Sequence, residues 1–265
     1  MDILEKIVEH KKKEVAERKI ATPLIELTKS VYFKEATRSL QKKLKSAGAS
    51  GIIAEHKRKS PSLGWIREHS DVVAVTTGYE KAGASCLSIL TDNYFFGGST
   101  HDLMSVTKRV NIPVLRKDFI IDEYQVFETK AMGADVMLLI AECLTKKEIK
   151  HLAQTAKNVG LEVLLELHDA EQLDKICDDV TCVGINNRNL KTFSVSIQSS
   201  IDLVKLIPNN FIKISESGIS QPERISELRA CGFKGFLIGE VFMKAEDPVG
   251  ALQKFILEIN GGSKS

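Results

Sequence analysis

The sequence predicts an α/β protein of the (β/α)8 TIM-barrel class with an N-terminal helical extension. Eight short apolar stretches alternate with longer stretches of helical periodicity. Their starts are separated by about 20 to 35 residues, the length of a strand, a loop and a crossover helix. The total of 265 residues is close to the roughly 250 of a typical barrel. We therefore expect a single domain over residues 1–265, with residues 1–48 as the extension.

Near-continuous apolar runs are typical of parallel strands that are covered on both faces. Such runs lie at residues 51–57, 86–92, 113–119, 136–142, 162–168, 182–188, 211–217 and 235–241. Helical patterns fill the intervals, at residues 71–82, 100–110, 122–132, 145–159, 170–177, 197–206, 221–230 and 249–259. An open doubly wound sheet is the alternative, but that fold usually carries a glycine-rich dinucleotide-binding loop, and no GxGxxG follows any of these runs.

Two helices are expected before the first strand. Residues 1–20 have a stripe of apolar side chains that includes Ile3, Ile7 and Val15, which predicts an amphipathic helix packed over the barrel. A second helix is expected over residues 33–45. Acidic residues interrupt the first stretch and it has no continuous apolar core, so we do not expect a signal peptide.

The composition favours a cytoplasmic globular protein that binds neither nucleic acid nor membrane. Hydrophobic residues make up 43% and charged residues 27% of the chain, and the formal net charge is only +2. No apolar run approaches the roughly 18 residues of a membrane span. The five cysteines include no CxxC pair, so we expect small buried hydrophobes rather than disulfides or metal ligands.

Polar residues collect at the C-terminal ends of the predicted strands, where barrel enzymes place their chemistry. Because side chains alternate along a strand, Glu55 and Lys57 share one face and His56 lies on the other. The other such residues are Lys117, Glu166, Asn186, Arg188 and Glu216. A structural ion pair would explain one strand end. Five strand ends that contribute polar or charged groups to one mouth indicate a catalytic site.

The last two predicted strands are followed by small residues that suit a phosphate. Gly218 and Gly239 would let the backbone approach a ligand closely, although ordinary turn glycines are the alternative reading. The spacing of Ser220, Pro222 and Glu223 predicts a capping box at the start of the next helix. A helix N-terminus with free N–H groups is a ready anion site. We therefore expect the phosphate of a small-molecule substrate between these two loops.

The motifs at the strand ends resemble those of one enzyme family. The segments are, in chain order, AEHKRKSPS, LTDNYFFGGS, VLRKDFIIDEYQ, LLELHD, GINNRNL, SESGI and LIGEVFM. They resemble the successive motifs of the indole-3-glycerol-phosphate synthases of tryptophan biosynthesis, which also have an N-terminal helical extension on the substrate side. The resemblance implies conversion of 1-(2-carboxyphenylamino)-1-deoxyribulose 5-phosphate into indole-3-glycerol phosphate, carbon dioxide and water, with no metal and no organic cofactor.

The resemblance also implies roles for residues of this chain. Six are implied to act on the reacting groups: Glu55, Lys57, Lys117, Glu166, Asn186 and Glu216. Lys117 is the general acid on the ribulose carbonyl. Lys57 pairs with the anthranilate carboxylate and can supply the acid for dehydration. Glu166 accepts a proton or stabilises developing positive charge. Glu55 and Glu216 orient the lysines and the substrate hydroxyls, and the asparagine helps to fix the intermediate.

Two further sets are implied to bind the substrate. The phosphate set is Ser60, Arg188, Ser217, Gly218, Gly239 and Glu240, the last through its backbone. The apolar set around the aromatic ring is Phe96, Phe119, Leu138 and Phe193. The loop after the first strand departs from the family pattern at Leu63 and Trp65, which affects loop closure rather than the reaction.

Two other functions are alternatives. A phosphoribosylanthranilate isomerase-like barrel usually lacks the extension and pairs a cysteine with an aspartate, but no cysteine ends the first strand here. A catalytically silent sugar-phosphate-binding barrel would be expected to have lost Lys57, Lys117 or Glu166, and all three are present. We expect a monomer, with a weak oligomer as the alternative.

Overall fold

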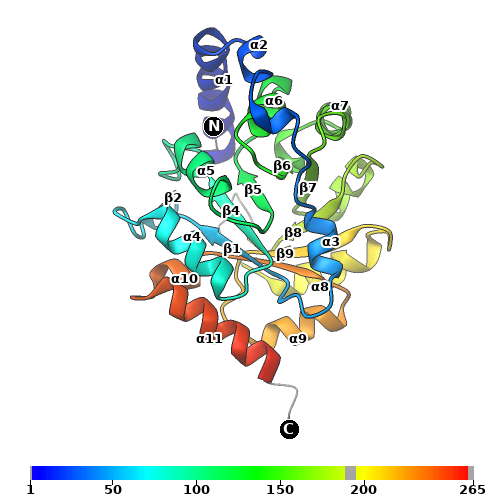
Figure 1. The fold of residues 1–265 in the computed structure, drawn as a ribbon. Helices are drawn as coiled ribbons and strands as arrows, with labels where there is room; N and C mark the ends of the chain where they lie inside the picture. The colour runs from blue at the N-terminus through cyan, green and yellow to red at the C-terminus, as the bar shows by residue number, and fades with distance from the viewer. Residues whose placement is uncertain (1, 189–194, 262–265) are drawn as a thin grey trace.

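The computed structural model describes residues 2–188 and 195–261, and in this part of the chain eight parallel strands close into a barrel (Figure 1). The strands are β1 (Ile52–His56), β4 (Cys86–Leu90), β5 (Val114–Lys117), β6 (Val136–Ile140), β7 (Glu162–Leu167), β8 (Cys182–Asn186), β9 (Ile212–Glu216) and β10 (Gly235–Ile238). Each pairs in parallel with its neighbours, and β1 pairs with β10 to close the ring. The predicted (β/α)8 fold is confirmed, and each predicted strand contains an observed one.

Helices cover the outside of the barrel (Figure 1). They are α4 (Val72–Lys81), α5 (Thr100–Thr107), α6 (Glu123–Ala131), α7 (Lys146–Asn158), α8 (Ile197–Leu203), α9 (Glu223–Ala230) and α11 (Pro248–Gly261), and the 3₁₀ segments η2 (Ala141–Cys143), η3 (Ala170–Lys175) and η4 (Val204–Leu206) join them. The predicted α-helix over 170–177 is the 3₁₀ segment η3, because the buried Gln172 side chain accepts from the His168 N–H and draws the segment back to the end of β7. No helix among the described residues combines the length and apolarity that crossing a membrane requires.

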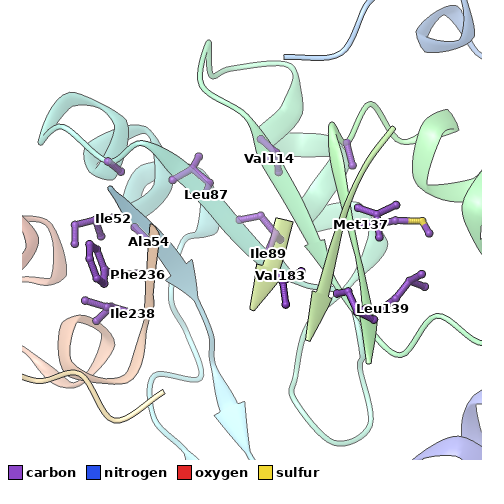
Figure 2. Packing of buried hydrophobic residues seen from close by; sticks show 14 of the residues in the cluster. Ile52, Ala54, Leu87, Ile89, Val114, Met137, Leu139, Val183, Phe236 and Ile238 are labelled. Carbon is purple, nitrogen blue, oxygen red and sulfur yellow. The ribbon is translucent and has the colours of Figure 1, made fainter. Parts of the chain in front are cut away.

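Side-chain alternation along the strands divides the core into two layers. Outward-facing residues of the strands pack against the helices, and Figure 2 shows part of this layer, including Ile52, Leu87 and Phe236. Inward-facing residues such as Ile53 and Leu115 fill the barrel itself. The inward positions at the C-terminal ends are polar, so the same alternation that fills the core directs the charged residues into the mouth.

The N-terminal extension covers both ends of the barrel. It comprises α1 (Ile3–Ala21), α2 (Leu24–Leu27), η1 (Val31–Phe33) and α3 (Leu40–Lys45). The predicted helix over 1–20 is α1, which begins with a capping box between Asp2 and Glu5. Leu40 and Leu44 of α3 are buried in the inward-facing cluster and close the barrel at the end opposite the mouth.

The predicted helix over 33–45 is wrong in its first half. Residues 34–39 lie between η1 and α3, and their polar groups bind the barrel instead of forming helical hydrogen bonds. Arg38 pairs with the buried Asp135 at 2.8 Å through its side chain, and its backbone N–H donates to the same carboxylate at 2.7 Å. These contacts outweigh the helical propensity of the segment.

Two local predictions are wrong, and one feature of the structure was not predicted. The predicted capping box is wrong, because α9 begins at Glu223 with Pro222 in the N-cap position and no side chain caps it. The last predicted strand runs too far, because residues 240 and 241 belong to a short helix, α10 (Glu240–Lys244). The loop after β1 contains a hairpin, formed by β2 (Lys59–Ser60) and β3 (Gly64–Trp65), that was not predicted.

All five cysteines are free thiols. Cys86 and Cys182 are buried and face the barrel interior, as expected for small hydrophobes. Cys143, Cys177 and Cys231 are only half-buried.

Candidate active site

Five strands contribute a polar side chain to the mouth of the barrel. They are Glu55 of β1, Lys117 of β5, Glu166 of β7, Asn186 of β8 and Glu216 of β9, and all five line one pocket. The three carboxylates are nearly inaccessible, since each residue is at most 4% exposed. Side chains this polar are seldom buried without partners, so their contacts determine what the site can do.

Lys117 lies among the carboxylates. Its Nζ is 3.1 Å from Glu166 Oε2 and 3.8 Å from Glu216 Oε2. The amide of Asn186 donates to the other Glu166 oxygen at 2.9 Å, which fixes the carboxylate against the lysine. A second lysine, Lys57, pairs with Glu55 at 3.1 Å, so the pocket presents two cations, each held by an acid.

The environment sets different protonation states for the two glutamates. Burial alone would lower the pKa of Lys117, but the surrounding acidic groups, Glu166 first, raise it above its ordinary value. Burial would raise the pKa of Glu166, but Lys117, His168 and the Asn186 hydrogen bond together outweigh that effect and lower it. The pKa of Glu216 is raised well above its usual range by burial and by the neighbouring Glu166 charge. The site therefore holds a charged lysine, an ionised glutamate and a neutral glutamic acid, a combination that supports acid and base chemistry together.

Gly184 of β8 makes room for Glu216. It occupies the inward position between Cys182 and Asn186, and a Cβ there would lie 2.2 Å from Glu216 Oε1. Only glycine leaves the space that this carboxyl group occupies. No pattern along β8 singles out this glycine, because the contact depends on the register between β8 and β9.

A second cavity adjoins the pocket beside the loops after β9 and β10. Its lining includes Ser217, Gly218, Gly239 and Glu240, and it shares Lys57 and Arg188 with the pocket. Arg188 pairs with Glu240 at 3.2 Å. Basic side chains beside closely approaching backbone are suited to an anion such as phosphate.

Ser217 adopts a left-handed conformation, with a φ of 68°, and Gly218 follows with 70°. A non-glycine residue in this region is strained by about 1–3 kcal/mol. The amide of Asn187 donates to the Ser217 carbonyl at 2.8 Å and to Ser215 Oγ at 3.1 Å, which holds the turn in place. Asn187 was not among the predicted residues, because it faces away from the barrel interior.

An apolar wall faces the two lysines. Phe96 and Phe119 lie with ring centroids 5.9 Å apart, and both line the pocket. Leu138 does not line it, since it is buried one layer deeper and Ile140, two residues further along β6, occupies the mouth. Ser60 lines this pocket rather than the second cavity beside the loops after β9 and β10. Phe193 lies outside the residues that the structure describes.

The family model for indole-3-glycerol phosphate synthase matches residues 4–255. The chain belongs to this family. An indole-3-glycerol phosphate synthase from Bacteroides thetaiotaomicron is 46% identical over 258 residues, which cover 97% of this chain and 99% of that protein. The enzyme of the same name from Thermoanaerobacter pseudethanolicus is 43% identical and covers 98% of this chain and 99% of its own length.

Solved structures outside the indole-3-glycerol phosphate synthase family share the fold alone. Tryptophan synthase subunit alpha from Legionella pneumophila superposes with a TM-score of 0.61 at 15% identity, over 85% of this chain and 98% of that one. The 3-hexulose-6-phosphate synthase from Salmonella typhimurium gives 0.63 at 12% identity, over 79% of this chain and 99% of that one. The barrel is therefore common to several enzymes, and the fold by itself does not identify the reaction.

Two further contributions to the site were not among the predicted site residues. His168 lies two residues after Glu166, directly past the end of β7, with Nε2 3.4 Å from Glu166 Oε1, and the alternation of side chains could have identified it. Ile3 and Ile7 of α1 line the pocket, so the extension forms part of its wall. Among the described residues, no cluster of histidine, cysteine, aspartate or glutamate has the arrangement of a metal site.

Proposed function

We propose that the protein converts 1-(2-carboxyphenylamino)-1-deoxyribulose 5-phosphate into indole-3-glycerol phosphate, carbon dioxide and water, with Lys117 as the general acid. The observation that carries the assignment is the position of Lys117, a charged lysine 3.1 Å from an ionised Glu166 in a pocket with an apolar wall. An attacked ketone needs a proton or a cation at its oxygen, and a tethered ammonium group supplies both.

Ring closure comes first in the proposed sequence. The aromatic carbon that bears the carboxylate attacks the ribulose carbonyl carbon, and Lys117 transfers a proton to the carbonyl oxygen. Lys57 pairs with the carboxylate of the substrate until carbon dioxide leaves and the ring becomes aromatic again. The exclusion of water by Phe96 and Phe119 strengthens both charge interactions.

Dehydration then completes the indole. The hydroxyl formed in the first step leaves as water with a proton from a lysine, for which Lys57 is the second acid. Glu166 accepts the proton that the intermediate loses or stabilises its positive charge, and Asn186 orients it. Glu55 and the neutral Glu216 hold the lysines and the substrate hydroxyls in place.

The substrate phosphate is proposed to bind in the cavity beside the loops after β9 and β10. Arg188 and Lys57 supply the charge there, and Ser217, Gly218, Gly239 and the Glu240 backbone supply the close approach. The distance from this cavity to Lys117 is spanned by the ribulose chain. Ser60 contacts the substrate from the adjoining pocket.

The remaining proposals concern the protein as a whole. Residues 1–265 act as one domain with residues 1–48 as the N-terminal extension. The protein works as a monomer in the cytoplasm, with a small phosphorylated substrate and without nucleic acid, and the weak net charge of +2 supports the last point. Catalysis needs no metal and no organic cofactor, so activity should be unchanged after dialysis against a chelator.

The proposed reaction is tested by incubating the purified protein with the carboxyphenylamino-deoxyribulose phosphate and recording indole fluorescence. Product should accumulate with one carbon dioxide released per indole formed. If no fluorescence develops with folded protein at substrate concentrations that saturate the site, as judged by substrate protection against heat denaturation, the assigned reaction is incorrect.

A further inference from the structure

Lys11 of α1 has no exposed surface although it is a lysine. It occupies the apolar stripe of the helix, between the buried Ile7 and Val15. Its Nζ lies 2.9 Å from Asp118, 3.0 Å from Asp92 and 2.7 Å from Glu14. A buried cation with three carboxylates around it remains charged, so these contacts are ion pairs rather than neutral hydrogen bonds.

Lys11 belongs to a closed ring of alternating charges. Asp118 continues to Arg116 at 3.0 Å, Arg116 to Glu128 at 2.7 Å, and Glu128 to Arg18 at 3.1 Å. Arg18 lies on α1 and closes the ring through its pair with Glu14, which in turn pairs with Lys11. The six members are Lys11, Glu14, Arg18, Glu128, Arg116 and Asp118, and they join α1 to α6 and to the end of β5.

The ring includes the residues on either side of Lys117, the proposed general acid. Arg116 and Asp118 are buried on the outward side of β5 and are members of the ring, while Lys117 between them faces the pocket. Asp118 also accepts from Thr91 at 2.6 Å and from the Phe119 N–H at 2.8 Å. The backbone that carries Lys117 is therefore fixed on both sides.

Lys11 reaches a second wall of the pocket through Asp92. The other oxygen of Asp92 accepts from the Phe95 N–H at 2.8 Å, next to the pocket residue Phe96. One ammonium group thus connects the helix that supplies Ile7, the loop that supplies Phe96 and the strand end that supplies Lys117.

We propose that Lys11 is a positioning residue for catalysis, which holds the end of β5 so that the Lys117 ammonium lies against Glu166. The proposal rests on the assignment of Lys117 as the acid. Hydrophobic packing alone would allow α1 to shift along the barrel. The ion pairs of Lys11 with Asp92 and Asp118 fix the position of the helix relative to the end of β5. A displacement of about 1 Å at a reacting group can cost about 100-fold in rate.

The test compares three variants of the full chain. Lys11→Met removes the cation from the ring. Arg18→Met opens the ring at its more exposed edge, and it leaves Glu128 paired with Arg116 and Glu14 paired with Lys11. Lys19→Met is the matched control, because Lys19 also ties α1 to the start of α6, through Asp122 at 2.7 Å, but touches no neighbour of Lys117.

Lys11→Met should lower kcat at least tenfold and Arg18→Met by a smaller factor, whereas Lys19→Met should leave kcat unchanged. The alkaline limb of the pH profile provides the second measurement. If Lys117 moves away from Glu166, it loses the interaction that keeps it protonated, so the limb should shift to lower pH in the ring variants. A merely structural role would lower the melting temperature without moving this limb.

Arg18→Met keeps the test decisive if Lys11→Met does not fold. An Arg18→Met enzyme with the kcat and the alkaline limb of Lys19→Met would overturn the proposal. Failure of the proposed function looks different, since the wild-type protein would then form no indole-3-glycerol phosphate, and an error in the assignment of Lys117 would leave Lys117→Met active. Activity lost in Lys117→Met but normal in every ring variant would reject only the role of Lys11.

Discussion

Replacing Lys117 by methionine tests the central assignment, because methionine keeps much of the side-chain volume and removes the proton and the charge. General acid catalysis contributes about 10²–10⁴-fold, which corresponds to about 2.7–5.4 kcal/mol of activation free energy. The structure places no other lysine within 4 Å of Glu166 among the described residues. We therefore expect kcat to fall by at least about 100-fold, the lower end of that range.

The same substitution should change the pH dependence of stability. Without Lys117, burial raises the pKa of Glu166, which is 1% exposed, and the folded state then holds a proton on it. A raised pKa in the folded state means that stability is lost as pH rises above the pKa of the unfolded chain. Removing one partner of a buried ion pair lowers the free energy of unfolding by up to about 3–5 kcal/mol when the other partner stays charged. Lys117→Met should therefore lose more stability near pH 8 than near pH 5.

The assay is steady-state formation of indole-glycerol phosphate, with circular dichroism as the folding control. Lys213→Met is the matched substitution, because Lys213 also lies on a barrel strand but bonds to Asn209 at 3.1 Å away from the mouth. A folded Lys117→Met enzyme whose kcat is within about tenfold of wild type, well under the usual contribution of a general acid, would refute the assignment.

Three further perturbations follow from the geometry. Gly239→Val should raise KM and also lower kcat, because its Cβ would lie 2.8 Å from the Cβ of Glu55, and unchanged steady-state constants would exclude a phosphate site here. Glu216→Gln should gain stability relative to wild type between pH 5 and pH 8. The reason is that the raised folded-state pKa of Glu216 makes the wild-type protein less stable as pH rises, whereas glutamine does not titrate. Equal differences in the free energy of unfolding by urea at the two pH values would contradict the neutral state of Glu216. Removal of residues 1–20 should raise KM, because Ile7 leaves the pocket, and should lower the melting temperature, because Asp92 and Asp118 lose Lys11; a truncated protein with full kcat/KM would show that the extension has no catalytic part.

Alternation along the strands was sufficient to predict which side chains enter the mouth. Glu55, Lys117 and Glu166 lie where the two-residue period places them, because parallel strands in a barrel have one inward face. Depth along the barrel axis could not be predicted in this way. Leu138 and Ile140 share a face, and the stagger between neighbouring strands, which a single strand does not encode, decides which of them reaches the pocket.

The N-terminal extension was predicted less well, for a related reason. Its apolar stripe predicted α1, but Lys11 within that stripe looks like a solvated position until its carboxylate partners, about 80 and 107 residues away, are brought to it by folding. Residues 34–39 likewise have helical propensity, and only the location of Asp135 at the base of the barrel explains why they are not helical. Partners distant in sequence decided both cases.

The closure of the barrel base by α3 has a consequence for the order of folding. Leu44 packs beside Gly235 of β10, where an added Cβ would lie 3.2 Å from the leucine side chain, so α3 docks on a surface that the last strand completes. Although α3 precedes all the barrel strands in the chain, it therefore cannot reach its final position until β10 has been made. Such contacts between distant parts of a chain slow folding. During synthesis the apolar face of α3 therefore stays exposed to solvent. It is buried late, when β10 pairs with β1 and the barrel closes.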